Sequence, residues 1–217
     1  MMDNTAVMKD GSDRLVSKDK PVDEAVRACR ENDVFETWQD TLLRPYRVWS
    51  PRELISDTRL LPCSPGVYGW WFRSVPPGVP VDGALKSPFG TLLYVGIAGR
   101  GKQATRTLRD RVKNHITGPI GSSTLRRTLA CLNAEQLGLQ IGRHPTSHRL
   151  VMSGSDEARL SEWMSEEARV AWVVCERPEE LEKAIITHGP RLPLNIQGSS
   201  DPYSKELRVI RSAIGST

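Results

Sequence analysis

The chain has 217 residues, 38% of them hydrophobic and 26% charged, and its formal net charge is +4. This composition is close to the globular average, which excludes a chain that is disordered throughout, and no apolar run approaches the roughly 20 residues of a membrane-spanning helix. Residues 1–13 are polar and lack the apolar segment of a secretion signal. We therefore expect a cytoplasmic protein that makes no contact with a membrane.

The N-terminal part of the chain is predicted to consist of a leader and a helical extension. Residues 1–20 have few apolar side chains and no periodicity, which predicts a disordered leader. Residues 21–62 are predicted to form an N-terminal helical extension, because apolar residues recur near helical spacing. Its expected helices cover residues 21–32 and 35–46, with a further helical turn within residues 51–61. The main domain is then expected to cover residues 63–217.

Three segments of the main domain have the composition of β-strands. Residues 64–72 are aromatic, residues 91–97 are rich in apolar side chains, and residues 170–175 form a buried apolar run. A loop rich in proline and glycine, residues 74–91, separates the first two strands, and loops of this length are usually functional or mobile. We predict an α+β fold, a mixed α/β sandwich with a small central three-stranded antiparallel sheet flanked by helices.

Helices are predicted between and after these strands. The first is capped near Thr105, the second is capped by Ser123, and the third is capped by Ser155 or Asp156. An apolar stripe at helical spacing gives the first of them a buried face. The remaining expectations are a helix from Pro178 to His188, irregular or extended chain over residues 140–152, an extended segment over 192–196, and a closing helix over 204–214.

Basic and acidic residues are segregated along the chain. Residues 100–127 contain a single acid, Asp110, whereas acids predominate over residues 156–182. A basic stretch of this kind is typical of a surface that binds the backbone of a nucleic acid, and an ordinary solvated helix face is the alternative. The residues predicted to contact nucleic acid are Arg100, Lys102, Arg106, Arg109, Lys113, Arg126 and Arg127.

The cysteines and histidines do not indicate a zinc site. The four cysteines are far apart and form no CxxC pair, so we expect them to be small buried hydrophobic residues. His144 and His148 are four residues apart, but Pro145 between them opposes a helix that would bring them together.

Two tyrosines lie beside glycines on the first two predicted strands. Gly66 precedes Tyr68 by two residues, and Gly96 follows Tyr94 by two. Glycine allows close approach of a backbone or a ligand, and tyrosine carries a hydroxyl on a rigid stem. Aromatic residues that pack across a hairpin are the alternative explanation of this pattern.

Further polar residues follow at helical spacing. Arg111 and His115 are four residues apart and therefore share one helix face, at the edge of the apolar stripe. Glu182 has Ile186 as its i+4 neighbour, which directs this carboxylate toward the protein. Asn195 follows in a segment that contains proline and leucine.

Together these residues resemble the signature of the GIY-YIG nuclease family. The two halves of that signature are similar to Gly66-Val67-Tyr68 and Tyr94-Val95-Gly96, each with Val in place of Ile. The helix with Arg111 and His115 resembles the family's catalytic helix, and Glu182 and Asn195 resemble its metal-binding glutamate and supporting asparagine. The chain departs from a minimal member by extra residues before that helix, in the long hairpin loop and before Glu182, none of which removes a site residue.

The resemblance implies a metal-dependent endonuclease that hydrolyses phosphodiester bonds in DNA. It implies that Glu182 holds Mg²⁺ (or Mn²⁺), with the nearby Glu179 and Glu180 as alternatives, that Arg111 binds the scissile phosphate and that Tyr68 is the general base. The catalytic set that it implies is Tyr68, Tyr94, Arg111, His115, Glu182 and Asn195. Two other functions stay open: a non-catalytic nucleic-acid-binding module with the same fold, and a structural or adaptor protein. The oligomeric state, monomer or homodimer, also stays open.

Overall fold

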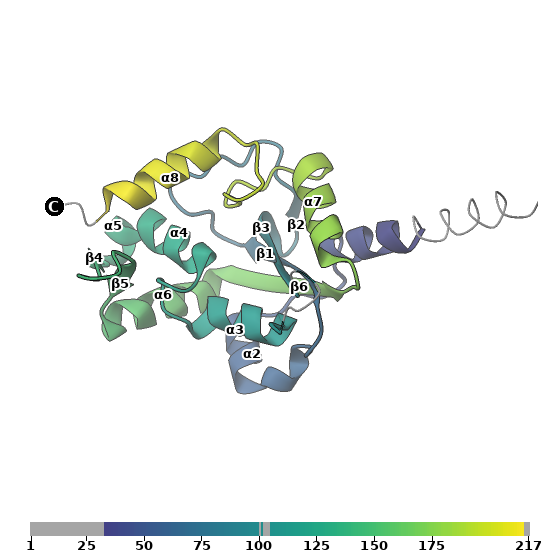
Figure 1. The fold of residues 1–217 in the computed structure, drawn as a ribbon, viewed down its shortest axis with the longest axis horizontal. Coiled ribbons are helices and arrows are strands. Elements are labelled where there is room, and N and C mark those ends of the chain that lie inside the picture. Colours follow the sequence, from purple (N-terminus) through teal and green to yellow (C-terminus); the bar gives the residue numbers. More distant parts are fainter. Residues whose placement is uncertain (1–32, 100, 102–104, 215–217) are drawn as a thin grey trace, which may run out of the picture. The chain divides into compact units, whose positions relative to one another are not determined.

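The structure is a computed structural model that describes residues 33–99, 101 and 105–214 (Figure 1). The predicted leader and the helix expected over residues 21–32 lie outside the described residues. By its contacts the chain divides after Phe35, and the unit that follows contains the sheet and the helices packed on it. No helix in these described ranges is long and apolar enough to cross a membrane.

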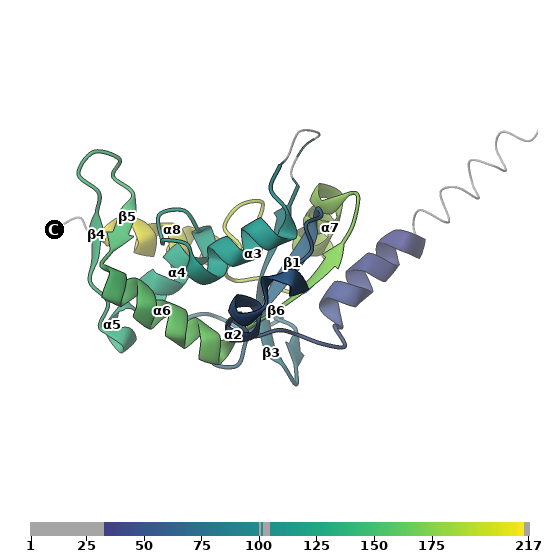
Figure 2. The ribbon, with the colours of Figure 1, turned by 90° about the horizontal axis from the view of Figure 1, so that it is seen from below.

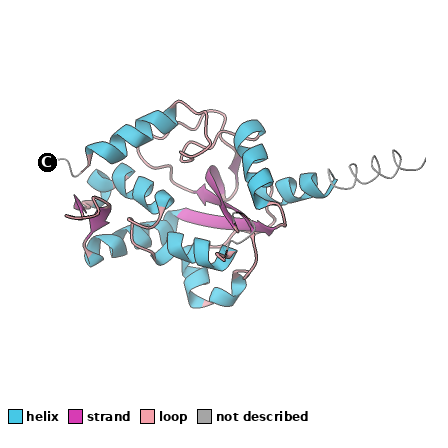
Figure 3. Ribbon diagram, in the orientation of Figure 1, coloured by secondary structure: helices cyan, strands magenta, loops and turns pink. Residues whose placement is uncertain are grey.

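A four-stranded antiparallel sheet with the strand order β2-β3-β1-β6 forms the centre of this unit (Figures 1 and 3). Its strands are β1 (Gly66–Phe72), β2 (Lys86–Ser87), β3 (Gly90–Ala98) and β6 (Ala168–Val174). The α+β class is confirmed, but the sheet has four strands and the prediction of three is wrong. The additional strand, β2, has two residues and pairs with the start of β3. A strand this short shows no alternation and gives no sequence signal.

The register of β1 against β3 brings the site tyrosines to one face of the sheet. Tyr68 pairs with Gly96 and Trp70 pairs with Tyr94, and residues paired across two strands share a face. After Trp70 the register shifts at a β-bulge. β1 is buried along its whole length, because strands lie on both sides of it and helices cover both faces of the sheet.

Helices lie above and below the sheet (Figure 1). α3 (Leu108–Thr117) packs its predicted apolar stripe against β1 and β3 and joins the core around Trp70. α4 (Thr124–Leu132) and α6 (Gly154–Glu167) contact α3 and extend this layer. α7 (Pro178–His188) contacts β3 and β1 from the opposite face.

Two helices begin two residues away from their predicted starts. α3 begins after Thr107 rather than near Thr105, because Thr107 forms a reciprocal capping box with the third residue of the helix. α6 begins after Ser153, whose hydroxyl accepts the backbone N–H of Asp156, rather than after Ser155 or Asp156. In both cases a nearby hydroxyl, two residues later for α3 and earlier for α6, satisfies a free N–H group of the first turn.

Other predicted bounds are confirmed or nearly so. α4 begins after its cap Ser123, and α7 begins at Pro178 and ends at His188. Residues 192–196, predicted to be extended, form a turn instead, in which the Asn195 N–H donates to Leu192 O. The remaining elements are α2 (Pro51–Ser56), a 3-10 helix (Thr58–Leu60), α5 (Ala134–Leu137), the paired strands β4 (Ile141–Arg143) and β5 (Leu150–Met152), and α8 (Tyr203–Ala213).

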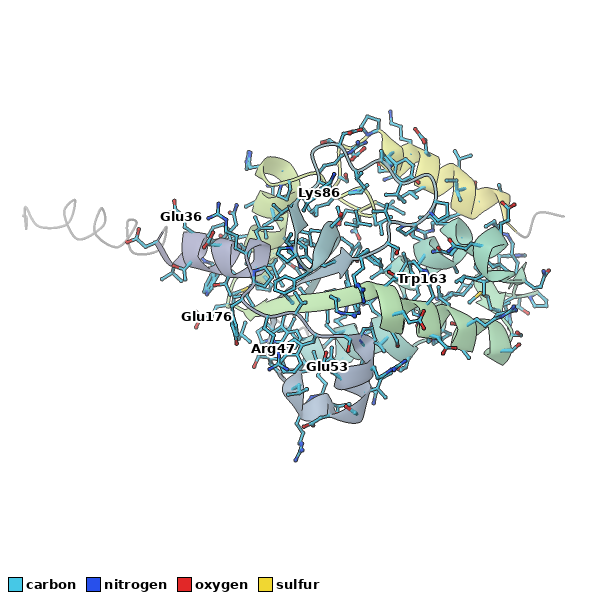
Figure 4. All side chains as sticks on the ribbon, turned by 180° about the vertical axis from the view of Figure 1, so that it is seen from behind. Glu36, Arg47, Glu53, Lys86, Trp163 and Glu176 are labelled. Atoms are coloured by element: carbon cyan, nitrogen blue, oxygen red, sulfur yellow. The ribbon has the colours of Figure 1, made fainter. Side chains whose placement is uncertain are left out.

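Residues before β1 contact the sheet directly. Residues 36–43 are helical, and Trp49 exchanges backbone hydrogen bonds of 2.9 Å with Val170 of β6. α2 follows, and Arg47 lies beside its Glu53 with 3.7 Å between the charged groups (Figure 4). This part of the segment therefore contributes to the layer that covers β6.

Candidate functional site

A pocket of about 430 Å³ lies along the C-terminal part of β3. β2 pairs with β3 only at Gly90 and Thr91, and the turn that follows α7 contacts the strand further on. There the Leu194 N–H donates to Leu93 O at 3.0 Å. The pocket is lined by Tyr94, Gly96, Ile97, Gly99, Thr105, Arg106, Arg111, Thr124, Glu182, Asn195, Ile196 and Gln197.

Asn195 fixes the edge of β3 with both ends of its amide. Its Oδ1 accepts the Val95 N–H at 2.9 Å, and its Nδ2 donates to Val95 O at 2.8 Å. The side chain is 4% exposed, so these bonds are shielded from water. Val95 lies between Tyr94 and Gly96, and Asn195 therefore acts through the backbone, as a positioning residue for both of them.

The glycines of the two motifs are required by close packing. A Cβ atom on Gly96 would lie 2.6 Å from the hydroxyl oxygen of Tyr68, and a Cβ on Gly66 would lie 2.2 Å from Val173 O in β6. Both distances are shorter than a non-bonded contact allows. Gly96 lines the pocket, so its missing side chain leaves the hydroxyl of the buried Tyr68 directly behind the pocket wall.

Tyr68, His115 and Ser123 form a buried chain of hydrogen bonds. Tyr68 Oη lies 2.7 Å from His115 Nε2, and His115 Nδ1 lies 2.7 Å from Ser123 Oγ. All three residues are at most 1% exposed. α3 supplies the histidine, while the serine is the N-cap of α4, so the chain joins the sheet to two helices.

Burial controls the protonation of this chain. Burial, together with the positive charges of Arg111 and Arg126, lowers the pKa of His115 from 6.5 to about 3, so the imidazole is neutral at physiological pH. Burial also raises the pKa of Tyr68 well above its ordinary value, and Tyr94 adds to this effect. Arg111 opposes it, because its positive charge and its hydrogen bond favour the phenolate.

Arg111 and Glu182 reach the pocket from opposite faces of the sheet. Arg111 is on α3 and Glu182 is on α7, and both are half-buried in the pocket wall. The structure thus brings together a cation and a carboxylate that are far apart in the sequence. Tyr94 lines the same pocket and is 8% exposed, whereas Tyr68 is fully buried.

The other two glutamates of α7 differ from Glu182 in position. Glu180 is exposed and forms an ion pair of 3.3 Å with Arg177. Glu179 lines a neighbouring hollow that Glu182 also borders, but not the pocket with Arg111. Of the three carboxylates, Glu182 alone lines the pocket that contains Arg111.

Three of the residues predicted to contact nucleic acid have structural partners. Arg126 is fully buried and donates to Glu157 Oε2 at 2.7 Å, so its guanidinium is not available to a phosphate and that prediction is corrected. Arg127 is half-buried and donates to the carbonyl oxygen of Gly121 at 2.7 Å. Arg109 donates to the carbonyl oxygen of Leu61 at 3.0 Å. Part of the basic stretch therefore holds helices and loops together.

The remaining basic residues lie in different places. Arg106 is exposed and lines the pocket, and Lys113 is exposed on α3. Arg100 and Lys102 lie outside the described residues. Arg106 is thus the member of the predicted basic set that the structure places beside Arg111.

Sequence reasoning missed the site roles of Ser123 and Thr124. Ser123 was expected only as a helix cap, yet its hydroxyl also bonds His115, and Thr124 lines the pocket. Ser123 follows His115 by eight residues across a turn between two helices. Helical periodicity does not extend across such a turn, so no pattern in the sequence indicates the contact.

The described residues contain no group of three or more histidine, cysteine, aspartate or glutamate side chains that could together hold a metal ion. The pocket offers the Glu182 carboxylate and the Tyr94 hydroxyl as oxygen donors. Such a site suits a cation that keeps most of its water ligands.

Comparison with known proteins gives one match. A family model described as the GIY-YIG catalytic domain matches residues 66–213. This range covers the strands with both tyrosine motifs, α3, α7 and the whole of α8. No curated protein and no solved structure matches the chain.

Proposed function

This chain belongs to the GIY-YIG catalytic domain family, a nuclease-type family, and on that premise we propose that it is a metal-dependent endonuclease that hydrolyses phosphodiester bonds in DNA. The observation that carries the proposal is the pocket beside β3. Arg111 and Glu182 line it from two different helices, and the buried Tyr68 lies behind its wall at Gly96. A cation, a carboxylate and a phenol in one pocket are suited to the hydrolysis of a phosphate ester.

Glu182 would hold the metal, Mg²⁺ or Mn²⁺. Mg²⁺ prefers oxygen ligands and keeps several waters, so one protein carboxylate beside an open pocket fits its chemistry. When bound, the ion supplies positive charge that neutralises the developing charge on the phosphate and on the leaving oxygen. Glu180, an alternative ligand on the same helix, forms an ion pair with Arg177 instead.

Arg111 would bind a non-bridging oxygen of the scissile phosphate. Its half-buried guanidinium has a fork of N–H donors that matches phosphate geometry. Held in place before the reaction, such a donor stabilises the negative charge that develops in the transition state. Tyr94, which also lines the pocket, would orient the attacking water and the phosphate.

The number of protons in the buried chain leaves two possible directions for its hydrogen bonds, and the surroundings of its two ends distinguish them. His115 is neutral, so Tyr68, His115 and Ser123 carry one proton each but share two hydrogen bonds. One proton must therefore point out of the chain. Ser123 Oγ is buried and also accepts the Arg126 backbone N–H, whereas Tyr68 lies against the pocket wall. We assign Ser123 as the donor to Nδ1, which directs the phenolic proton toward the pocket.

This arrangement prepares Tyr68 to accept a proton. With Nδ1 occupied by Ser123, the Nε2–H of His115 donates to the phenolic oxygen, and Arg111 adds a positive charge nearby. Both stabilise the phenolate and act against the burial that raises the Tyr68 pKa. Once its phenolic proton has passed to solvent through the pocket, Tyr68 as phenolate would take a proton from the attacking water, and His115 would act as its positioning residue.

A plasmid assay with Mg²⁺ tests the proposal. We expect the native protein to nick or linearise supercoiled DNA, and expect Glu182→Gln and Arg111→Ala to abolish cleavage. Glu180→Gln, on the same helix but paired outside the pocket, is the matched control and should cleave normally. If the native protein and all variants leave the plasmid intact, nuclease activity on DNA is refuted. DNA affinity retained in that case favours a non-catalytic binding module, and its absence removes the nucleic-acid function as well.

A further inference from the structure

A second pocket, of about 480 Å³, is lined mainly by arginines. They come from three parts of the chain that are distant in sequence: α4, the β4–β5 hairpin and α8. Figures 1 and 2 show this hairpin beside the C-terminal end of α8. The five arginines, here called the arginine cluster, are Arg127, Arg143, Arg149, Arg208 and Arg211.

The arginine cluster is not paired with carboxylates within the described part of the chain. Among the residues that the structure describes, none of its five guanidinium groups forms an ion pair, although the chain pairs many other arginines with carboxylates. Burial lowers the pKa of Arg211, and Arg127 and Arg208 lower it further by repulsion. Positive charges gathered without a counter-charge cost free energy, unless an anion binds there.

Several members of the cluster are held in place by backbone carbonyl groups. Arg143 donates to His148 O at 3.1 Å and to Ser212 O at 2.9 Å, which joins the β4–β5 hairpin to the end of α8. Arg208 donates to Ile196 O at 2.9 Å. These bonds orient guanidinium groups in advance, a condition that lowers the entropy cost of binding an anion.

The arginine cluster is continuous with the pocket beside β3. Ile196 lines both pockets. Thr124 lines the first and Arg127 the second, and these two residues are three apart on α4 and therefore lie on one face. Along the helix they are separated by roughly 4.5 Å, less than one turn. A ligand that occupies the first pocket and extends past α4 reaches the cluster.

We propose that the arginine cluster binds the phosphates of the nucleic-acid strand next to the scissile phosphate. This inference rests on the proposed function and deepens it, because it names the surface that holds the substrate beyond the catalytic pocket. Five guanidinium groups from three parts of the chain suit a series of phosphates better than one ion, since different groups can bind different phosphates. The contacts go to the backbone and carry no sequence preference.

The test compares two double variants of the full chain. Arg149→Gln with Arg211→Gln removes two charges whose side chains make no hydrogen bond among the described residues. Arg52→Gln with Arg73→Gln removes two charges from exposed sites that line neither pocket, and serves as the matched control. Binding of a labelled duplex is measured by fluorescence anisotropy in EDTA over a range of KCl concentrations. Thermal unfolding of each variant shows that it is folded.

We expect the negative slope of log K against log[KCl] to become shallower by about 1.8 for the cluster variant, because each lost phosphate contact contributes about 0.9. The control should keep the native slope. If the native protein cleaves DNA but the cluster variant keeps the native slope, this inference is overturned and the proposed function stands. If the parent binds no nucleic acid, the proposed function falls with it. Calorimetry with inorganic phosphate adds a third arm: tight binding that the cluster variant loses, with an unchanged DNA slope, would assign the cluster to a small anion instead.

Discussion

Ser123 combines two tasks in one hydroxyl group. It accepts the Arg126 N–H as the cap of α4, and it bonds His115 Nδ1 at 2.7 Å in the buried chain. Ser153 also caps a helix, α6, but lies away from the pocket and contacts Ser155 and Asp156 of its own helix instead of a histidine. The pair therefore separates the effect of capping from the effect on His115.

Ser123→Ala should lower the catalytic rate more than its loss of stability explains. Each of Ser123→Ala and Ser153→Ala should cost about 1 kcal/mol of unfolding free energy, the usual value of an N-cap. Only Ser123→Ala removes the hydroxyl that donates to Nδ1. The proton of His115 can then lie on Nδ1 instead of Nε2, and the hydrogen bond that His115 donates to Tyr68 is lost. Steady-state kinetics should show a lower kcat for Ser123→Ala and a native kcat for Ser153→Ala.

Nitrogen NMR of His115 provides a readout that does not depend on activity. The native protein should show the proton on Nε2, and Ser123→Ala should show a mixture of both tautomers. A native protein with the proton on Nδ1 would contradict the assigned direction of the chain.

The buried His115 should also make stability depend on pH. Its folded pKa is about 3 against 6.5 for the free side chain, so the unfolded chain binds the proton first as pH falls. The stability associated with neutral His115 is present above pH 6.5 and is lost toward pH 3, by up to about 1.4 kcal/mol per pH unit. Thermal unfolding between about pH 7 and pH 4.5 should show this slope.

His115→Gln should flatten that dependence, and His188→Gln, at an exposed position, should retain it. An NMR titration of His115 in the native protein gives an independent check. A midpoint near the ordinary value of 6.5 would show that the imidazole is not held neutral by burial.

At the scale of elements, the basic stretch after β3 divides into residues that hold helices together and residues that face the pocket. Arg126 of α4 joins α6 through Glu157, and its side chain is 1% exposed. Its Nη1 also donates to Ile116 O of α3 at 2.7 Å. Arg106, by contrast, is exposed in the pocket wall. One sequence pattern thus contains two physical roles.

Alanine variants should separate these two roles. Arg126→Ala should destabilise the fold by about 3 kcal/mol, because it leaves Glu157 unpaired in a partly buried place, while the folded fraction keeps its DNA affinity. Arg106→Ala should keep the native melting temperature and weaken DNA binding several-fold at moderate salt. Chemical denaturation measures the unfolding free energy of both variants, and fluorescence anisotropy measures their DNA affinity. Weaker binding by a fully stable Arg126→Ala protein would argue against a structural role for that residue.

At the scale of the whole molecule, apolar packing joins the layers around the sheet. The described residues offer no cluster of metal ligands, and the layers are held by apolar cores on both faces of the sheet. A metal at a single carboxylate binds weakly, and a weak ligand adds little to folding stability.

Removal of divalent ions should therefore abolish cleavage without unfolding the protein. We expect EDTA to stop plasmid cleavage while shifting the melting temperature by about a degree or less. Added Mg²⁺ should restore activity in full. A large drop in melting temperature with EDTA would indicate a structural metal and contradict the single-carboxylate site.

Local patterns in the sequence determined much of this protein. The α+β class, the stripe on α3, the cap at Ser123 and the bounds of α7 follow from propensity, periodicity and capping, which act over a few residues. The order of the tyrosines, the arginine, the glutamate and the asparagine was sufficient to indicate the family.

Tertiary structure alone decided how these residues are used. The short β2 has no local signal, and the pairing of Asn195 with Val95 joins residues a hundred positions apart. The bond from Ser123 to His115 and the burial of Arg126 depend on how helices pack, and the arginine cluster forms only when three distant segments meet. Contacts between distant segments depend on the packed fold, which no short window of sequence records.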